Sequence, residues 1–287
     1  MQCKIKLMKV IQTVKDLQTL LRQYRQAGKN IGLVPTMGAL HEGHATLVKR
    51  CVSENDICVV SVFVNPTQFN NSDDLKLYPR TPEKDYDLLE SIGTHIAFTP
   101  TVEEIYPEPD TRIFDFGGLD KVMEGTFRPG HFNGVAQVVS KLFDFVKPDK
   151  AYFGEKDFQQ LSIIKKMVKQ MKLPVEIVAV PTVRESSGLA MSSRNQRLSE
   201  QQREYAAGIH RIMRESTLMM AEKTPDELTR LVTEWVNNVP ELRVEYFRIV
   251  DGDSLQQISS WYDSGNIVGA IAVYCGEVRL IDNIRYR

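Results

Sequence analysis

The sequence has few cysteines and no long hydrophobic run. Its 287 residues include four cysteines, with no C-x-x-C pair and no zinc-like spacing, namely Cys3, Cys51, Cys58 and Cys275. This pattern predicts reduced thiols in a cytoplasmic protein and not a disulfide framework. The longest mostly apolar runs, residues 57–64 and 267–274, span eight residues each, with one interruption at Ser61 and at Gly269. A membrane-spanning helix needs about 20, so we expect no membrane partner.

Positively and negatively charged residues are nearly equal in number. Lysines and arginines number 36 against 37 aspartates and glutamates, for a formal net charge of −1. A protein that binds a long polyanion usually carries a basic surplus, so we expect no nucleic-acid partner. Four lysines between residues 165 and 172 fit the solvated face of a helix.

Neither G-x-x-x-x-G-K-[ST] nor G-x-G-x-x-G occurs, which excludes two common nucleotide-binding motifs.

Strand-like and helix-like segments alternate over the first two-thirds of the chain. The expected strands cover residues 31–35, 57–64, 95–98, 151–153 and 175–180, and apolar spacing predicts helices at 47–52, 135–143 and 163–171. Continuously apolar strands are typical of a parallel sheet buried on both faces. We therefore predict a Rossmann-like, doubly wound α/β domain over residues 1–184, with its ligands at the carboxyl ends of the strands.

The pattern changes after about residue 185. Residues 185–195 form a polar stretch that we interpret as a hinge. Ser199 with Gln202 makes a capping box for a helix over about 200–220, and Thr224-Pro225 begins another within 224–238. Strand-like runs follow at 244–250, 267–274 and 278–284, the last two joined by a hairpin turn at 275–277. We predict that residues 185–287 form a smaller C-terminal α+β domain that closes over the ligand site.

The strongest candidate for chemistry is the stretch Pro35-Thr36-Met37-Gly38-Ala39-Leu40-His41-Glu42-Gly43-His44, between an expected strand and an expected helix. A helix N-terminus favours phosphate, and glycines let the backbone approach a ligand. The two histidines can become charged as negative charge builds on leaving oxygens. Two alternatives stay open: a metal-binding histidine pair, although no third ligand cluster stands out nearby, and a purely structural loop.

Two further segments carry cationic side chains. Lys156 lies in 152–160, where a strand gives way to a helix, and would direct a point charge at phosphate. Asp157 beside it would hold the lysine or a Mg²⁺-bound water, or would simply cap the helix. In the stretch 190–195, Ser192, Ser193 and Arg194 could close over a triphosphate, or form a polar loop with a capping serine.

The remaining candidates are less charged. Gln68 follows the most apolar strand, and its amide suits hydroxyl and carboxylate groups, the alternative being a surface-loop glutamine. Residues 128–134, which include Arg128 and His131, could form a mobile rim of the site.

Together these segments, spread over residues 34–198, resemble the pantothenate synthetases (pantoate–β-alanine ligases). That family belongs to the nucleotidyl transferases with the H-x-G-H signature, here residues 41–44, and residues 191–194 resemble their mobile second motif. The resemblance implies an AMP-forming ligase that activates pantoate with ATP and Mg²⁺ as an acyl-adenylate and joins it to β-alanine. It also implies a cytoplasmic homodimer. The alternative is another H-x-G-H nucleotidyl transferase.

The resemblance also implies roles for individual residues. His44 would be the principal catalytic histidine, acting with His41, Lys156 and Arg194. Gln68 and Gln160 would hold pantoate, and Gln68 would also lie near β-alanine. Some relatives carry an acidic run where this chain has Glu83-Lys84-Asp85, so we assign no protein metal ligand. The expected ATP contacts are Met37, Gly38, Ala39, Leu40, His41, Glu42, Gly43, His44, Gly154, Glu155, Lys156, Asp157, Val183, Met191, Ser192, Ser193 and Arg194.

Overall fold

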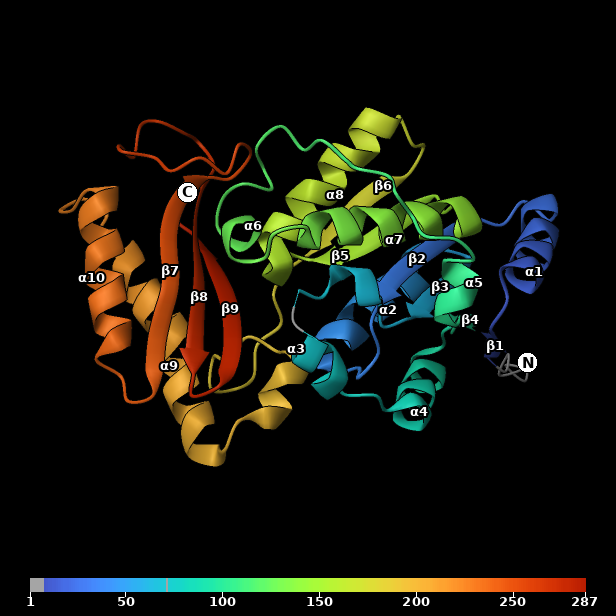
Figure 1. Cartoon of the computed structure of the whole chain (residues 1–287), viewed down its shortest axis with the longest axis horizontal. Helices are drawn as coiled ribbons and strands as arrows, with labels where there is room; N and C mark the ends of the chain where they lie inside the picture. Colours follow the sequence, from blue (N-terminus) through green and yellow to red (C-terminus); the bar gives the residue numbers. More distant parts are fainter. Residues whose placement is uncertain (1–7, 71) are drawn as a thin grey trace. The chain divides into compact units, whose positions relative to one another are not determined.

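The computed structural model describes residues 8–70 and 72–287, which form two compact units (Figure 1). The first unit consists of Met1–Phe116, Arg128–Gly154 and Ile163–Val180, as far as these are described. The second consists of Gly117–Phe127, Glu155–Ser162 and Pro181–Arg287. Both units thus draw on separate stretches of the chain. The expected division into residues 1–184 and 185–287 stays a prediction.

A six-stranded sheet forms the centre of the first unit. Its order is β1-β4-β3-β2-β5-β6, and every neighbouring pair is parallel. The strands are β1 (Lys9–Ile11), β2 (Ile31–Thr36), β3 (Ile57–Val62), β4 (Ile96–Phe98), β5 (Lys150–Gly154) and β6 (Glu176–Val180). All five predicted strands are present. The structure confirms the doubly wound α/β fold.

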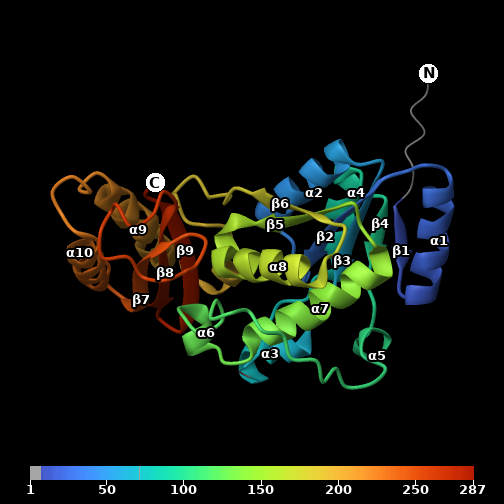
Figure 2. The same ribbon diagram turned by 90° about the horizontal axis from the view of Figure 1, so that it is seen from above.

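Helices cover both faces of this sheet, as Figure 2 shows. On one face lie α2 (Glu42–Glu54) and α4 (Pro82–Ile92), and on the other α7 (His131–Val146) and α8 (Phe158–Met171). Val48 of α2 and Leu89 of α4 pack with Val34 and Val60 of the strands in a fully buried cluster. Burial on both faces explains why these strands read as continuous apolar runs. Met171 is exposed at the end of α8, although the apolar spacing of residues 163–171 includes it.

Four further elements complete the described part of the first unit. These are α1 (Val14–Gln26), η1 (Pro66–Gln68), α3 (Ser72–Leu77) and α5 (Val102–Ile105). The start of α1 has a clear local cause, because the side chain of Thr13 accepts a hydrogen bond from the backbone N–H of Asp16.

The three described cysteines, Cys51, Cys58 and Cys275, are free thiols, and Cys3 lies outside the described residues.

The second unit contains an antiparallel sheet of β7 (Leu242–Asp251), β8 (Ile267–Cys275) and β9 (Val278–Arg285). The predicted hairpin turn is Gly276-Glu277, with Gly276 at a φ of +53°. One face of the sheet packs on α9 (Glu200–Thr217) and α10 (Pro225–Asn237). Both predicted helix starts are confirmed, since Ser199 and Thr224 each form a capping box. The remaining elements of the unit are α6 (Glu124–Phe127), η2 (Glu155–Asp157) and η3 (Ser193–Arg197).

A partly buried ion cluster joins Gly117–Phe127 to the other face of this sheet. The guanidinium of Arg279 donates to Glu124 at 2.7 and 2.9 Å and to Glu245 at 2.5 and 3.0 Å. The Tyr246 hydroxyl also donates to Glu124, at 2.8 Å. Burial alone would lower the pKa of Arg279, but the two glutamates outweigh it and raise that pKa. The cluster fixes α6, whose residues lie far in sequence from the strands that they contact.

Candidate functional site

Two adjacent strands end at the point where the strand order of the first unit reverses. Strands β3 and β4 lie on one side of β2, whereas β5 and β6 lie on the other. Because β2 and β5 are parallel neighbours, their carboxyl ends at Thr36 and Gly154 lie at the same edge of the sheet. Doubly wound folds bind ligands at such a switch point. The candidate segments that begin at Met37 and at Gly154 therefore leave the sheet where a ligand is expected.

The turn after β2 has an unusual backbone, held by a buried carboxylate. Gly38 and Ala39 have φ values of +78° and +49°. Asp85 of α4, only 2% exposed, accepts the backbone N–H groups of Ala39 at 2.9 Å and Leu40 at 2.8 Å. Thr81 donates to the same carboxylate at 3.1 Å. These N–H groups are already bonded, so any nucleotide contact of Ala39 and Leu40 must use other atoms.

The two histidines that follow cap α2. The Nδ1 atom of His41, the N-cap residue, accepts the backbone N–H of Gly43 at 3.1 Å, and Nδ1 of His44 accepts the N–H of His41 at 3.4 Å. Their ring centroids lie 4.1 Å apart. An imidazole whose Nδ1 accepts a hydrogen bond carries its proton on Nε2 when neutral. The capping geometry therefore makes Nε2–H the donor of both rings.

The side chain of Gln68 is buried and hydrogen-bonded, so the surface-loop alternative is wrong. It donates to Met37 Sδ at 2.9 Å and accepts from Asn65 at 3.2 Å. Nδ1 of His131 lies 2.8 Å from the Gln68 carbonyl oxygen. The amide of Gln68, 8% exposed, is thus held in one orientation next to the first residue of the Met37–His44 segment.

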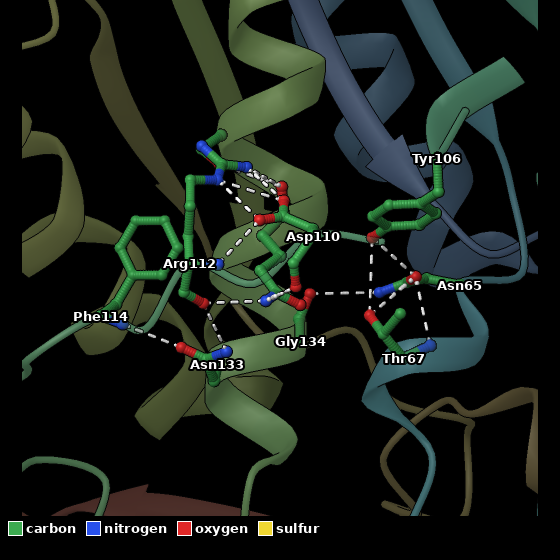
Figure 3. Close-up of polar contacts among 10 residues, drawn as sticks. Asn65, Thr67, Tyr106, Asp110, Arg112, Phe114, Asn133 and Gly134 are labelled. Atoms are coloured by element: carbon green, nitrogen blue, oxygen red, sulfur yellow. Dashed lines mark hydrogen bonds and ion pairs between the residues drawn. The ribbon is translucent and has the colours of Figure 1, made fainter. Parts of the chain in front are cut away.

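Asn65, which the sequence analysis missed, organises this region (Figure 3). Its side chain is 1% exposed and accepts from the hydroxyls of Tyr106 at 3.0 Å and Thr67 at 3.1 Å. Its amide also donates to the carbonyl of Gly134 at 3.2 Å. Burial raises the pKa of Tyr106, which keeps its hydroxyl a donor. A polar residue directly after a buried strand, followed by Pro66, is the signal that could have revealed it.

The segment expected to form a mobile rim instead supports Gln68. His131, Phe132 and Gly134 are buried at the start of α7. A Cβ atom on Gly134 would lie 2.5 Å from the carbonyl oxygen of Thr67, so the two backbones pass too closely for any side chain. The rim interpretation is therefore wrong for these three residues.

In the second unit, the 3-10 turn η2 carries Lys156. The carbonyl groups of Glu155 and Lys156 both accept hydrogen bonds from the side-chain amide of Asn283, at 2.8 and 3.0 Å. Lys156 is half-buried, and Asp157 is exposed immediately before α8. Gln160 is half-buried in the first turn of α8.

The other predicted segment of this unit is a small hairpin. Arg184 and Ala190 form an antiparallel bridge, and the N–H of Met191 donates to the carbonyl of Val183 at 3.0 Å. Ser192 is the N-cap of η3 and accepts from the N–H of Arg194 at 3.2 Å. The capping serine that we considered as the structural alternative is thus present, and it orients the backbone at Arg194.

The predicted site residues therefore divide between the two units. Each unit holds its own segments in defined conformations. The first unit contains Met37 to His44, Gln68 and Gly154, and the second contains Glu155, Lys156, Asp157, Gln160, Val183 and Met191 to Arg194.

Within residues 8–70 and 72–287, no three histidine, cysteine, aspartate or glutamate side chains are grouped to hold a metal ion. No helix in the described ranges is both long and apolar enough to span a membrane.

Comparison with known proteins shows similarity over almost the whole chain. The sequence profile of the family described as pantoate–β-alanine ligase matches residues 9–285. Pantothenate synthetase from Bacteroides thetaiotaomicron is 61% identical over 280 residues, covering 98% of this chain and 99% of the relative. The crystal structure of pantothenate synthetase from Thermus thermophilus matches with a TM-score of 0.91 and 43% identity, over 97% of this chain and 99% of that one. Pantoate–β-alanine ligase from Francisella tularensis, complexed with β-γ ATP and β-alanine, matches with a TM-score of 0.83 and 35% identity, over 97% and 98%.

Proposed function

The chain belongs to the pantoate–β-alanine ligase family and joins pantoate to β-alanine, and we propose that it does so through a pantoyl adenylate. In the first step, a carboxylate oxygen of (R)-pantoate attacks the α-phosphorus of ATP, forms a mixed anhydride and expels diphosphate. In the second, the neutral amine of β-alanine attacks the acyl carbon, expels AMP and loses a proton. The product is pantothenate.

The main obstacle in the first step is charge, because an anion approaches a polyanion. Donors and cations that face the phosphates lower this barrier without acting as nucleophiles. We assign this role to His44 and His41, whose capped rings present Nε2–H, and to Lys156 and Arg194. Mg²⁺ enters with ATP as part of the substrate, bound by phosphate oxygens and water.

We propose that the other predicted ATP residues contact the nucleotide as well. Met37 to Gly43 and Gly154 would contact the nucleotide from the switch point, and Glu155, Asp157, Val183, Met191, Ser192 and Ser193 from the second unit. Gln68 and Gln160 would bind pantoate, with Gln68 also near β-alanine. The observation that supports the pantoate role best is the fixed, buried amide of Gln68 beside Met37.

The adenylate route is tested by isotope exchange between diphosphate and ATP. We expect exchange that requires pantoate and proceeds without β-alanine, since the intermediate forms before the amine reacts. Another nucleotidyl transferase would show exchange with a different acid or phosphate. If exchange needs β-alanine, the two steps are not separate and the adenylate proposal is wrong.

The residue roles are tested by His44→Ala and Lys156→Ala. Removing one donor of this kind typically costs about 100- to 1000-fold in kcat, and we expect losses of that order with the fold retained. Exchange rates and circular dichroism of each variant provide the measurement. If a variant keeps the wild-type rate, the role assigned to the replaced residue is wrong.

We also propose a cytoplasmic homodimer, as the family resemblance implies. The free state of the three described cysteines is compatible with a reducing compartment. Sedimentation equilibrium at micromolar concentration would give twice the 32.7 kDa chain mass. A single species at the chain mass would contradict the dimer.

A further inference from the structure

Two consecutive residues of β9 hold the two candidate ATP segments of the second unit. The side chain of Asn283 uses its amide to bind η2, donating to the carbonyls of Glu155 at 2.8 Å and Lys156 at 3.0 Å. A primary amide has two donor hydrogens, and both are directed at this turn. Lys156 is thus tied to the edge strand of a sheet through its own backbone.

The preceding residue, Asp282, holds the hairpin of residues 183–194. Its carboxylate forms a bidentate ion pair with Arg184 at 2.6 and 2.9 Å, and this carboxylate is only 6% exposed. Arg184 also donates to the Gly188 carbonyl at 3.2 Å, across the hairpin. Bidentate pairs of this type fix direction as well as distance. The hairpin therefore has a defined orientation on β9.

The two contacts lie on opposite faces of the strand. Side chains of consecutive strand residues point to opposite sides. Accordingly, Leu280, on the same face as Asp282, belongs to the core cluster that includes residues of α9 and α10. Ile281, on the same face as Asn283, packs against a different buried cluster, which includes Tyr246. The backbone links the contacts too, because Arg184 donates to the Asn283 carbonyl at 3.4 Å and Asp282 accepts the Asn283 N–H at 2.8 Å.

We propose that Asp282 and Asn283 are positioning residues for adenylation, which set Lys156 and the Met191–Arg194 segment in the relative arrangement that one triphosphate requires. This inference rests on the proposed function, which makes Lys156 and Arg194 phosphate contacts. Neither Asp282 nor Asn283 needs to touch the nucleotide. Their effect on rate should pass through the residues that they hold.

The test is a double-mutant cycle measured by pantoate-dependent diphosphate–ATP exchange. We expect Asn283→Ala to lower kcat/KM by about 10- to 100-fold, because displacements near 1 Å cost rates of this order. In the Lys156→Ala background the same change should cost less than about threefold, since the group that it positions is already absent. Asp282→Asn and Arg194→Ala form a second cycle with the same expected coupling.

Asn266→Ala is the matched control. Asn266 lies in the same unit, donates to Asp253 at 3.1 Å and accepts from Arg285 at 2.6 Å, but holds neither ATP segment. It should stay within about twofold of the wild-type rate. If Asn283→Ala does not fold, Asn283→Leu removes the donors while filling the space and replaces it in the cycle.

The outcomes separate the two claims. The positioning role alone is overturned if the losses in the double variants multiply. It is also overturned if an Asn283 variant is folded and as active as the Asn266 control. A wild-type rate for Lys156→Ala overturns the role of Lys156 in the proposed function and the positioning claim for Asn283 with it. Coupled losses in both cycles support the proposal.

Discussion

Replacement of Asp85 by asparagine perturbs the turn after β2 without changing the size of the side chain. One carboxylate oxygen accepts from Leu40 at 2.8 Å and from Thr81 at 3.1 Å, and the other accepts from Ala39 at 2.9 Å. Asparagine keeps the first oxygen and places an NH₂ group against the N–H of Ala39. That N–H then has no acceptor in a site with almost no access to water.

The size of the effect follows from this geometry. A hydrogen bond to a charged group contributes about 1.5 to 3 kcal/mol, and a buried donor left unsatisfied costs about 1 to 3 kcal/mol. The two figures describe overlapping losses, so we expect Asp85→Asn to lower the free energy of unfolding by about 2 to 4 kcal/mol. For a protein of this size that corresponds to a decrease in Tm of roughly 3 to 7 °C.

Activity should fall as well, because the turn leads directly into His41 and His44. Ala39 has a φ of +49°, a conformation that costs an alanine about 1 kcal/mol and that the bond to Asp85 helps to maintain. When this turn relaxes, the imidazoles shift, and we expect kcat to fall by about 10- to 100-fold.

Thermal unfolding and exchange assays of Asp85→Asn and Asp87→Asn provide the comparison. Asp87 lies on the same helix, undergoes the same change of charge and is exposed. The control should change the free energy of unfolding by less than about 0.5 kcal/mol. Equal Tm values and equal rates for the two variants would show that Asp85 does not stabilise the turn.

Two further predictions concern the second unit. Burial, and then the charge of Arg184, lower the pKa of His210 from its usual 6.5. The contribution of His210 to the free energy of unfolding is therefore fully present above pH 6.5 and is lost as the pH falls, because the unfolded chain binds the proton before the folded chain does. Urea unfolding at pH 7.5 and 5.5 should show a weaker pH dependence for His210→Gln than for wild type, and identical dependence would contradict this. Arg279→Met leaves the buried Glu124 and the half-buried Glu245 without their partner and should cost about 3 to 5 kcal/mol. Adding Glu124→Gln should restore part of the Tm, and a further fall would argue against the charge explanation.

The sequence predicted the elements whose signals are local. The apolar run at residues 57–64 led to β3, and the capping boxes at Ser199 and Thr224 located the starts of α9 and α10. The H-x-G-H stretch was placed correctly between a strand and a helix. In each case a few neighbouring residues determine the local structure.

Contacts between distant residues could not be predicted in the same way. Nothing near Asp85 indicates that its carboxylate binds a turn 45 residues earlier, and the pair of Glu124 and Arg279 spans 155 residues. The role of Asn65, whose side chain orients Gln68, could not be read from its neighbours either. These residues act through tertiary contacts that depend on the whole sheet, and no local pattern encodes them.

The proposed function requires that His44, Lys156 and Arg194 act on the phosphates of one ATP molecule. A crystal structure of the protein with a non-hydrolysable ATP analogue, Mg²⁺ and pantoate tests it most directly. We expect one nucleotide with all three side chains within hydrogen-bonding distance of its phosphate oxygens, and the pantoate carboxylate facing the α-phosphorus. A nucleotide bound with any of the three turned toward solvent, beyond reach of the phosphates, would contradict it.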